Sequence, residues 1–195
     1  MKTFFNKTQN KKTLQDKYNY IKSHFYYYTG NSWNRLKSLA NNVKIYNLPL
    51  TEQQKNKFYE LNADEQTSEQ LYDYINDYIN EYNQDSNNYN IYFNGRSGGY
   101  LVLYKKNSND NAIDDDILYS EDYNDIINYY KNDLSWTARD SRAKAKQIIT
   151  ENFEIVKKFD EFCDNMLDGL VYFLDNSTIE ETEITYTKKV KTINL

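Results

Sequence analysis

The chain has 195 residues and a mass of 23.4 kDa, which suits one domain or at most two small ones. Its single Cys excludes an intrachain disulfide and therefore a secreted disulfide scaffold, and one Pro with five Gly excludes a collagen-like or linker protein. The mean hydropathy is -0.95, no apolar run approaches the roughly 20 residues of a membrane span, and the start of the chain lacks the apolar region of a signal peptide, so we expect an intracellular protein without a membrane partner.

The charges are unevenly distributed, although the formal net charge is only -5. Residues 1–60 hold 11 Lys and Arg against 3 Asp and Glu, whereas residues 61–135 hold 4 against 15. This asymmetry has three interpretations, which the sequence leaves open. The two regions neutralise each other, the acidic region faces a basic partner, or the basic region binds nucleic acid.

The first third of the chain predicts two helices and an extended link. Residues 13–29 repeat apolar side chains every three or four positions, and Thr13 is the predicted N-cap. A second, shorter helix is predicted over residues 32–40. Residues 43–50 are predicted to form an extended link, which contains the only proline of the chain, Pro49.

Two sequences of the capping-box type predict where the next two helices begin. The first box starts at Thr51 and the second at Thr67. In the second of these helices Leu71, Ile75 and Tyr78 recur on one face, which is typical of a helix packed against a core. The opposite, outer face of that helix is acidic and consists of Asp73, Asp77 and Glu81.

The middle of the chain predicts the only hairpin. Residues 89–93 and 100–104 are short, rich in aromatic and β-branched residues, and separated by a glycine-rich turn. Residues 107–116 are polar and are predicted to be a surface loop. Ser120 is the predicted N-cap of the helix that follows.

The last third predicts one long helix over residues 138–174, with a bend near Gly169 or a partner that covers its excess length. Residues 184–193 give a weak strand pattern and are expected to pair with the hairpin, because a lone hairpin is marginal in water. The predicted fold class is therefore α+β: a mostly helical single domain over residues 1–195, with a small antiparallel sheet and one long C-terminal helix.

Tyr contributes 21 residues, an unusually large share. AT-rich codons explain such a share, and enrichment for contacts with a partner is the alternative explanation. In either case we expect Tyr to form much of the core, with a hydrogen-bond partner for every buried hydroxyl.

The chain offers few residues for catalysis or metal binding. The single His, His24, and the single Cys, Cys163, are too few for a structural zinc site, and Cys163 falls on the apolar stripe of the long helix. We therefore expect no catalytic site, no metal and no cofactor. Catalysis by carboxylates alone stays open, because the 29 acidic residues offer too many pairs to rank.

Two polar segments are candidate contact sites. The turn of the hairpin is explained by glycines that supply positive φ angles, but its exposed tip also presents a set of donors suited to a carboxylate or a phosphate, namely Asn94, Arg96 and Ser97. The second segment lacks the alternating pattern of a calcium loop and is expected to be a solvated acidic loop, with weak divalent-ion binding left open; it contains Asp114, Asp115 and Asp116.

The basic N-terminal region alternates cations with aromatic residues, which is typical of proteins that bind single-stranded nucleic acid. No RRM, KH, zinc-finger or helix-turn-helix motif accompanies it. The candidate nucleic-acid contacts in this region are Lys11, Lys12, Lys17, Lys22, Arg35 and Lys37.

Residues 92–103, with the sequence YFNGRSGGYLVL, resemble a hairpin found in small proteins of phages and other mobile elements. The resemblance covers about twelve residues and implies a genomic neighbourhood rather than a mechanism. In its small size and acidic, Tyr- and Asn-rich composition the chain is also similar to anti-CRISPR and anti-restriction inhibitors, which occupy surfaces of host proteins and often use carboxylates in place of phosphates. The net charge of -5 is modest for a protein that mimics DNA over its whole surface.

These observations lead to a functional hypothesis. We expect a non-enzymatic phage or mobile-element protein that acts in the cytoplasm of a bacterial host and inhibits a host defence protein, such as a CRISPR-Cas nuclease. The acidic residues from the middle of the chain would bind a basic surface on that partner. The alternative is a nucleic-acid-binding module that uses the basic N-terminal helices, and a homodimer stays open because the long helix carries a long apolar stripe.

Overall fold

The computed structural model describes residues 13–23, 44–95, 99–106 and 112–178. The predicted helix over 32–40, the predicted strand over 184–193 and the end of the first predicted helix lie outside these residues. The described helices are α1 (Leu14–Ser23), α2 (Glu52–Leu61), α3 (Glu65–Asp85), α4 (Asp115–Leu118), α5 (Tyr123–Asn128), the π-helical segment η3 (Tyr129–Asp133) and α6 (Ala138–Asn176); the strands are β1 (Lys44–Asn47), β2 (Tyr89–Asn94) and β3 (Tyr100–Lys105).

The structure confirms the α+β class: helices pack against a small antiparallel sheet with the strand order β1-β3-β2. The predicted hairpin is present, with Asn94 opposite Tyr100 at its closed end. Gly99 has a φ of 87°, which supplies the positive φ expected of this turn. Residues 43–50 were expected to be an extended link outside the sheet. This expectation is corrected, because Lys44–Asn47 pair with β3 as the third strand.

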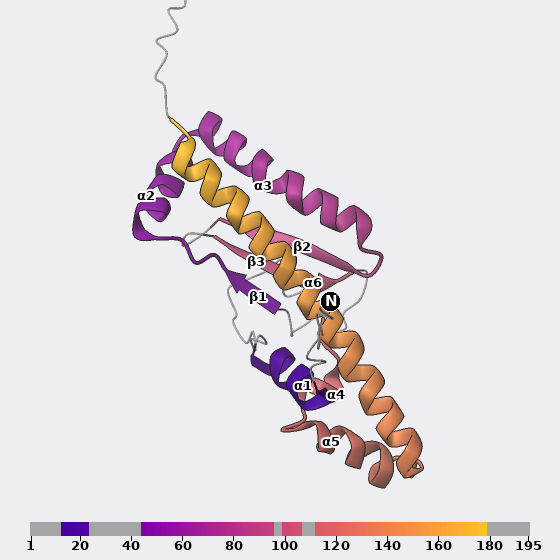
Figure 1. Cartoon of the computed structure of the whole chain (residues 1–195). Coiled ribbons are helices and arrows are strands. Elements are labelled where there is room, and N and C mark those ends of the chain that lie inside the picture. The colour runs from indigo at the N-terminus through magenta and orange to yellow at the C-terminus, as the bar shows by residue number, and fades with distance from the viewer. Residues whose placement is uncertain (1–12, 24–43, 96–98, 107–111, 179–195) are drawn as a thin grey trace, which may run out of the picture.

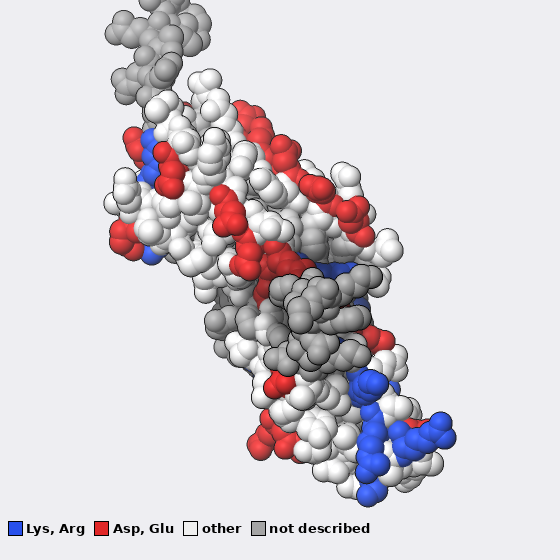
Figure 2. Space-filling model, viewed as in Figure 1, with Lys and Arg blue, Asp and Glu red and all other residues white. Residues whose placement is uncertain are grey.

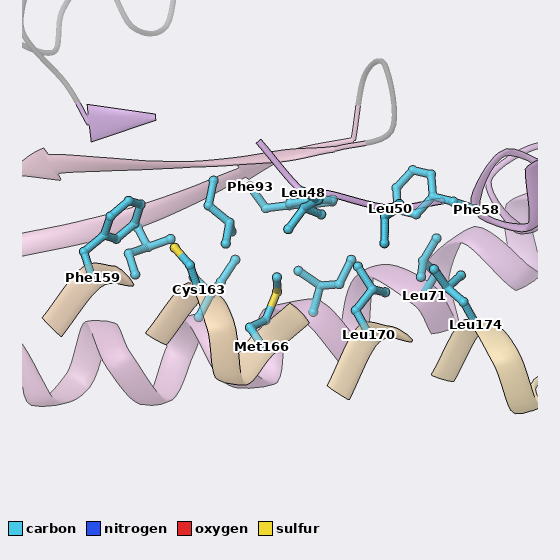
Figure 3. Packing of buried hydrophobic residues seen from close by; sticks show 14 of the residues in the cluster. Leu48, Leu50, Phe58, Leu71, Phe93, Phe159, Cys163, Met166, Leu170 and Leu174 are labelled. Carbon is cyan, nitrogen blue, oxygen red and sulfur yellow. The ribbon is translucent and has the colours of Figure 1, made fainter. Parts of the chain in front are cut away.

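Helix α6 is the axis of the molecule and joins two hydrophobic clusters (Figure 1). Its 39 residues run through Gly169 as one continuous helix with a length of about 58 Å, so no break occurs there. The first cluster packs the C-terminal half of α6 against α2, α3 and the sheet, and includes Phe58, Leu101 and Leu170. Figure 3 shows residues of this cluster converging from the chain after β1, from α3 and from α6.

The second cluster packs the N-terminal half of α6 against α1, α4 and α5. Ile21, Ile117 and Ile149 are almost completely buried in it. Two residues of the predicted surface loop, Ala112 and Ile113, are also buried, Ile113 as a member of this cluster, which corrects that expectation. Ile113 packs there with residues of α1, α5 and α6 that lie far away in the sequence.

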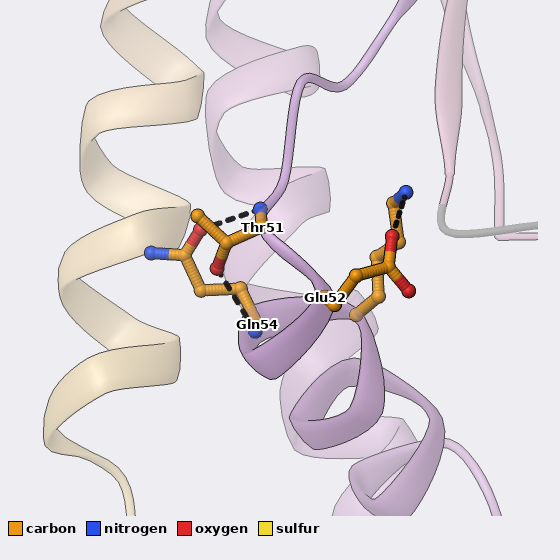
Figure 4. A network of polar contacts seen from close by, with 4 residues as sticks. Thr51, Glu52 and Gln54 are labelled. Atoms are coloured by element: carbon orange, nitrogen blue, oxygen red, sulfur yellow. Dashed lines mark hydrogen bonds and ion pairs between the residues drawn. The ribbon is translucent and has the colours of Figure 1, made fainter.

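Hydrogen bonds at the helix N-termini confirm two predicted caps and correct two others. Thr51 and Gln54 form the predicted reciprocal capping box, shown in Figure 4, and Thr13 accepts from the backbone N–H of Asp16. The box predicted at Thr67 was wrong, because α3 begins at Glu65 with Asp64 as its N-cap. The cap predicted at Ser120 was also wrong, since Asp122 occupies that position before α5.

Candidate functional site

Helix α3 is held on one side by the first hydrophobic cluster, and this fixes which of its residues face outward. Leu71, Ile75 and Ile79 are buried against that cluster. Tyr74 donates a hydrogen bond to the carbonyl oxygen of Gly169 at 3.1 Å, which attaches α3 to α6. The opposite side of α3 is therefore presented to solvent on a rigid support.

The three acidic residues predicted on α3 lie on this outer side. Asp73, Asp77 and Glu81 are all exposed. Within the described ranges, none of the three carboxylates is part of an ion pair or a hydrogen bond. Figure 2 shows the acidic side chains following α3 along one half of the molecule.

Two further acidic residues extend this set and were not selected from the sequence. Glu69 and Asp85 are also exposed, and with the three predicted residues they give five carboxylates at a constant spacing of four residues. We call Glu69, Asp73, Asp77, Glu81 and Asp85 the acidic row. The row spans about 24 Å along the helix axis, and no Lys or Arg occurs in α3. The constant spacing was the signal in the sequence that would have identified the two missing members.

The acidic row weakens the helix that carries it. Each like-charged pair four residues apart costs roughly 0.2–0.5 kcal/mol, so four such pairs cost on the order of 1–2 kcal/mol. Asp85 also lies in the last turn of α3, where the helix dipole disfavours negative charge. The local stability of α3 therefore does not explain the row.

The second acidic set, residues 114–116, is partly engaged inside the molecule. Asp114 accepts a hydrogen bond from the buried side chain of Asn152 at 2.7 Å. Asp116 accepts one from the hydroxyl of Tyr130 at 2.6 Å, and burial followed by this bond raises the pKa of Tyr130. These two carboxylates join segments of the second cluster. The expectation that residues 114–116 form a solvated loop is therefore wrong for Asp114 and Asp116.

A pocket of about 450 Å³ lies between α4 and α5. It combines carboxylates with exposed tyrosine rings, a combination that suits a Lys or Arg side chain. Asp125, however, already accepts from the backbone in the capping box of α5. The acidic row on α3 is therefore the stronger candidate; the pocket is lined by Asp115, Asp116, Tyr119, Ser120, Asp125, Ile126 and Tyr129.

The remaining predicted contacts are only partly described. Asn94 ends β2 and is half-buried, whereas Arg96 and Ser97 lie outside the described residues. Lys17 lies over the ring of Phe153 at 4.9 Å, and Lys22 donates to three backbone carbonyls of the segment 117–120 at 3.0 to 3.2 Å. Both lysines therefore make contacts within the protein, Lys17 with an aromatic ring and Lys22 with backbone carbonyls. The other four basic candidates, Lys11, Lys12, Arg35 and Lys37, lie outside the described residues, as does His24.

The described residues give no support to a metal site. They contain no group of three or more His, Cys, Asp or Glu placed to hold a metal ion. Cys163 is fully buried in the first cluster, which confirms the prediction that it is a core residue. Among the helices described here, none has both the length and the apolar character needed to cross a membrane.

Comparisons with known proteins give no match: no protein-family model, no curated protein and no solved structure is similar to this chain. The acidic row is therefore interpreted from its own geometry.

Proposed function

We propose that the protein is a non-enzymatic interaction protein of a phage or mobile element, which binds a basic surface of a bacterial host defence protein and inhibits it in the cytoplasm. The observation that carries this proposal is the acidic row: five exposed carboxylates, evenly spaced on a helix without a single cation. A row that weakens its own helix is explained when a partner supplies the missing positive charge.

A CRISPR-Cas nuclease is the partner class that fits this surface best. Such nucleases hold their guide–target duplex in a positively charged channel that contacts the backbone rather than the sequence. A rigid line of carboxylates about 24 Å long offers that channel a substitute for a strand of phosphates. Occupation of the channel blocks the nuclease without any chemical step, so the proposal requires no catalytic residue.

The test measures inhibition of purified CRISPR-Cas nucleases from several classes. The wild-type chain should reduce target cleavage by at least one of them, and the variant Asp73→Lys/Asp77→Lys/Glu81→Lys should lose this inhibition. In this variant the pairs 69–73 and 81–85 become attractive, so α3 is expected to remain folded. Plating of phage on bacteria that carry the same nuclease provides the corresponding measurement in cells.

The matched control reverses three exposed acids outside α3, Glu121→Lys/Asp133→Lys/Glu154→Lys, and so produces the same change in net charge. Inhibition should survive in this control. Equal loss of inhibition in both variants would show that total charge matters and the acidic row does not. Absence of inhibition across the panel would reject a CRISPR-Cas nuclease as the partner.

A further inference from the structure

The N-terminal end of α6 is basic, in contrast to the acidic row. Arg139, Arg142, Lys144 and Lys146 fall within its first nine residues, and Asp140 is the only acid among them. The carboxylate of Asp140 is engaged at the start of the helix, where it accepts a hydrogen bond from the hydroxyl of Thr137 at 2.7 Å. Figure 2 shows Lys and Arg side chains gathered at the end of the molecule where α5 and α6 meet, away from the acidic side chains of α3.

Three of these cations form a line on the surface of the helix. Arg139, Arg142 and Lys146 follow each other by three and four residues, which places them on one face over about 10 Å. All three are exposed. In the part of the chain that the structure describes, none of them has an ion-pair partner.

An aromatic side chain directly precedes this line. The ring of Trp136 packs against Tyr130 at 4.9 Å between centroids, yet 42% of the residue remains exposed. The backbone N–H of Trp136 donates to the carbonyl oxygen of Tyr130 at 2.9 Å, and the hydroxyl of Tyr130 is anchored to Asp116. Trp136 is thus fixed on one side and open on another, and Tyr129, whose ring contacts that of Tyr130, is 44% exposed.

The backbone that presents Trp136 adopts an unusual conformation. Ser135 has a φ of 57°, a left-handed value that residues other than glycine seldom adopt. It lies between η3 and the N-cap of α6, directly before Trp136 and four residues before Arg139, the first cation of the line. Such conformations persist only where the surrounding structure enforces them, and they concentrate at functional sites.

We propose that this surface, formed by Trp136, Arg139, Arg142 and Lys146, binds single-stranded nucleic acid. The three cations pair with successive backbone phosphates, and an unpaired base stacks on the open side of the Trp136 ring. The ring distinguishes this ligand from an acidic protein or an anionic membrane, because stacking requires a planar base. A duplex keeps its bases stacked on one another and offers the ring no free face. The surface is separate from the acidic row and adds a second binding activity to the proposed function.

The test is fluorescence anisotropy with the full chain and a labelled single-stranded oligothymidine, over about 50 to 200 mM salt. Binding should weaken as salt rises, with a slope of about -2 in log K against log salt, because three phosphates each contribute about -0.7. The variant Arg139→Gln/Arg142→Gln/Lys146→Gln should lose most of this slope. Trp136→Ala should weaken binding about tenfold, and Trp136→Phe should restore most of it.

Two controls keep the result specific to this surface. The variant Lys55→Gln/Lys57→Gln/Lys158→Gln removes the same charge elsewhere and should bind as the wild type does. In a Trp33→Phe background Trp136 is the only remaining Trp, so its fluorescence should be quenched by oligothymidine. Absence of binding at low salt, equal weakening in both triple variants, or equal binding of duplex DNA or phosphatidylserine vesicles would overturn the proposal.

Discussion

Asn152 shows how one buried side chain connects segments that lie far apart in the sequence. Its amide nitrogen donates to the carboxylate of Asp114 and to the carbonyl oxygen of Ile148, and its amide oxygen accepts from the backbone N–H of Asp114 at 3.0 Å. The side chain is 1% exposed, so each polar group requires a partner within the protein. The start of α4 is thereby fixed against α6.

Asn152→Ala should lower the free energy of unfolding by about 2 kcal/mol, because it leaves polar groups of residue 114 without a buried partner and opens a small cavity. Urea denaturation measures this loss. Asn176→Ala is the control, since that amide bonds only its own helix end in the exposed last turn. A loss equal to that of the control would show that Asn152 does not hold α4.

The tyrosines meet one expectation in part and correct another. Two hydroxyls have the expected partners: Tyr18 donates to the carbonyl oxygen of Ser120 at 2.8 Å, and the partly buried Tyr20 donates to Asp160 at 2.6 Å. The centres of both clusters, however, consist mostly of aliphatic residues and Phe, while many tyrosines lie half-buried around them. Their hydroxyls reach the surface or a carboxylate there, which composition alone does not specify.

The burial of Tyr82 makes the stability of the fold depend on pH in the alkaline range. Burial against Phe162, with a smaller contribution from Cys163, raises the pKa of Tyr82 to about 12. Between about pH 10 and pH 12 the unfolded chain therefore loses this proton while the folded chain keeps it, so the free energy of unfolding falls as pH rises. Tyr82→Phe should make this fall less steep in urea denaturation across that window. An unchanged slope would contradict the assignment.

At the scale of elements, α3 and α6 approach closely at a glycine. A Cβ atom at Gly169 would lie 2.5 Å from the hydroxyl oxygen of Tyr78 and 3.1 Å from that of Tyr74. Tyr74 also stacks on Phe173 at 4.8 Å between centroids. Glycine in the interior of α6 therefore lowers helix propensity but permits the contact that orients the acidic row.

Gly169→Ala should gain less stability in the wild type than in a Tyr78→Phe background. Alanine is favoured over glycine inside a helix by about 1 kcal/mol, but in the wild type the new methyl group displaces the Tyr78 hydroxyl. A double-mutant cycle based on thermal unfolding isolates this coupling. Additive effects of the two substitutions would show that the contact imposes no restriction at position 169.

Several elements could be predicted from the sequence because their signals are local. The box at Thr51, the hairpin and the apolar stripe of α6 depend on residues a few positions apart, and all three are present. The same type of signal misplaced the start of α3, since Asp64 provides an equally good cap three residues before Thr67 and adds a turn of helix. β1 has only four residues, and its pairing with β3 depends on the tertiary fold.

At the scale of the whole molecule, the described residues carry charge of opposite sign on two surfaces, the acidic row of α3 and the basic N-terminal end of α6. The sequence indicated an acidic middle and named three of the five members of the acidic row, but exposure and the absence of ion pairs within the described ranges required the structure. The basic end of α6 was not predicted, because the net charge of residues 136–195 is close to zero and conceals the cations gathered at its start. Only the three-dimensional arrangement separates the two surfaces.

The most direct test of the acidic row is the rate at which the chain associates with the proposed nuclease partner, measured by stopped flow over a range of salt concentrations. For the wild type, the rate should fall steeply as salt rises, because carboxylates on α3 steer the encounter. Asp73→Lys/Asp77→Lys/Glu81→Lys should associate at least tenfold more slowly at low salt, with little dependence on salt. An unchanged rate and salt dependence in this variant would contradict the proposed role of α3.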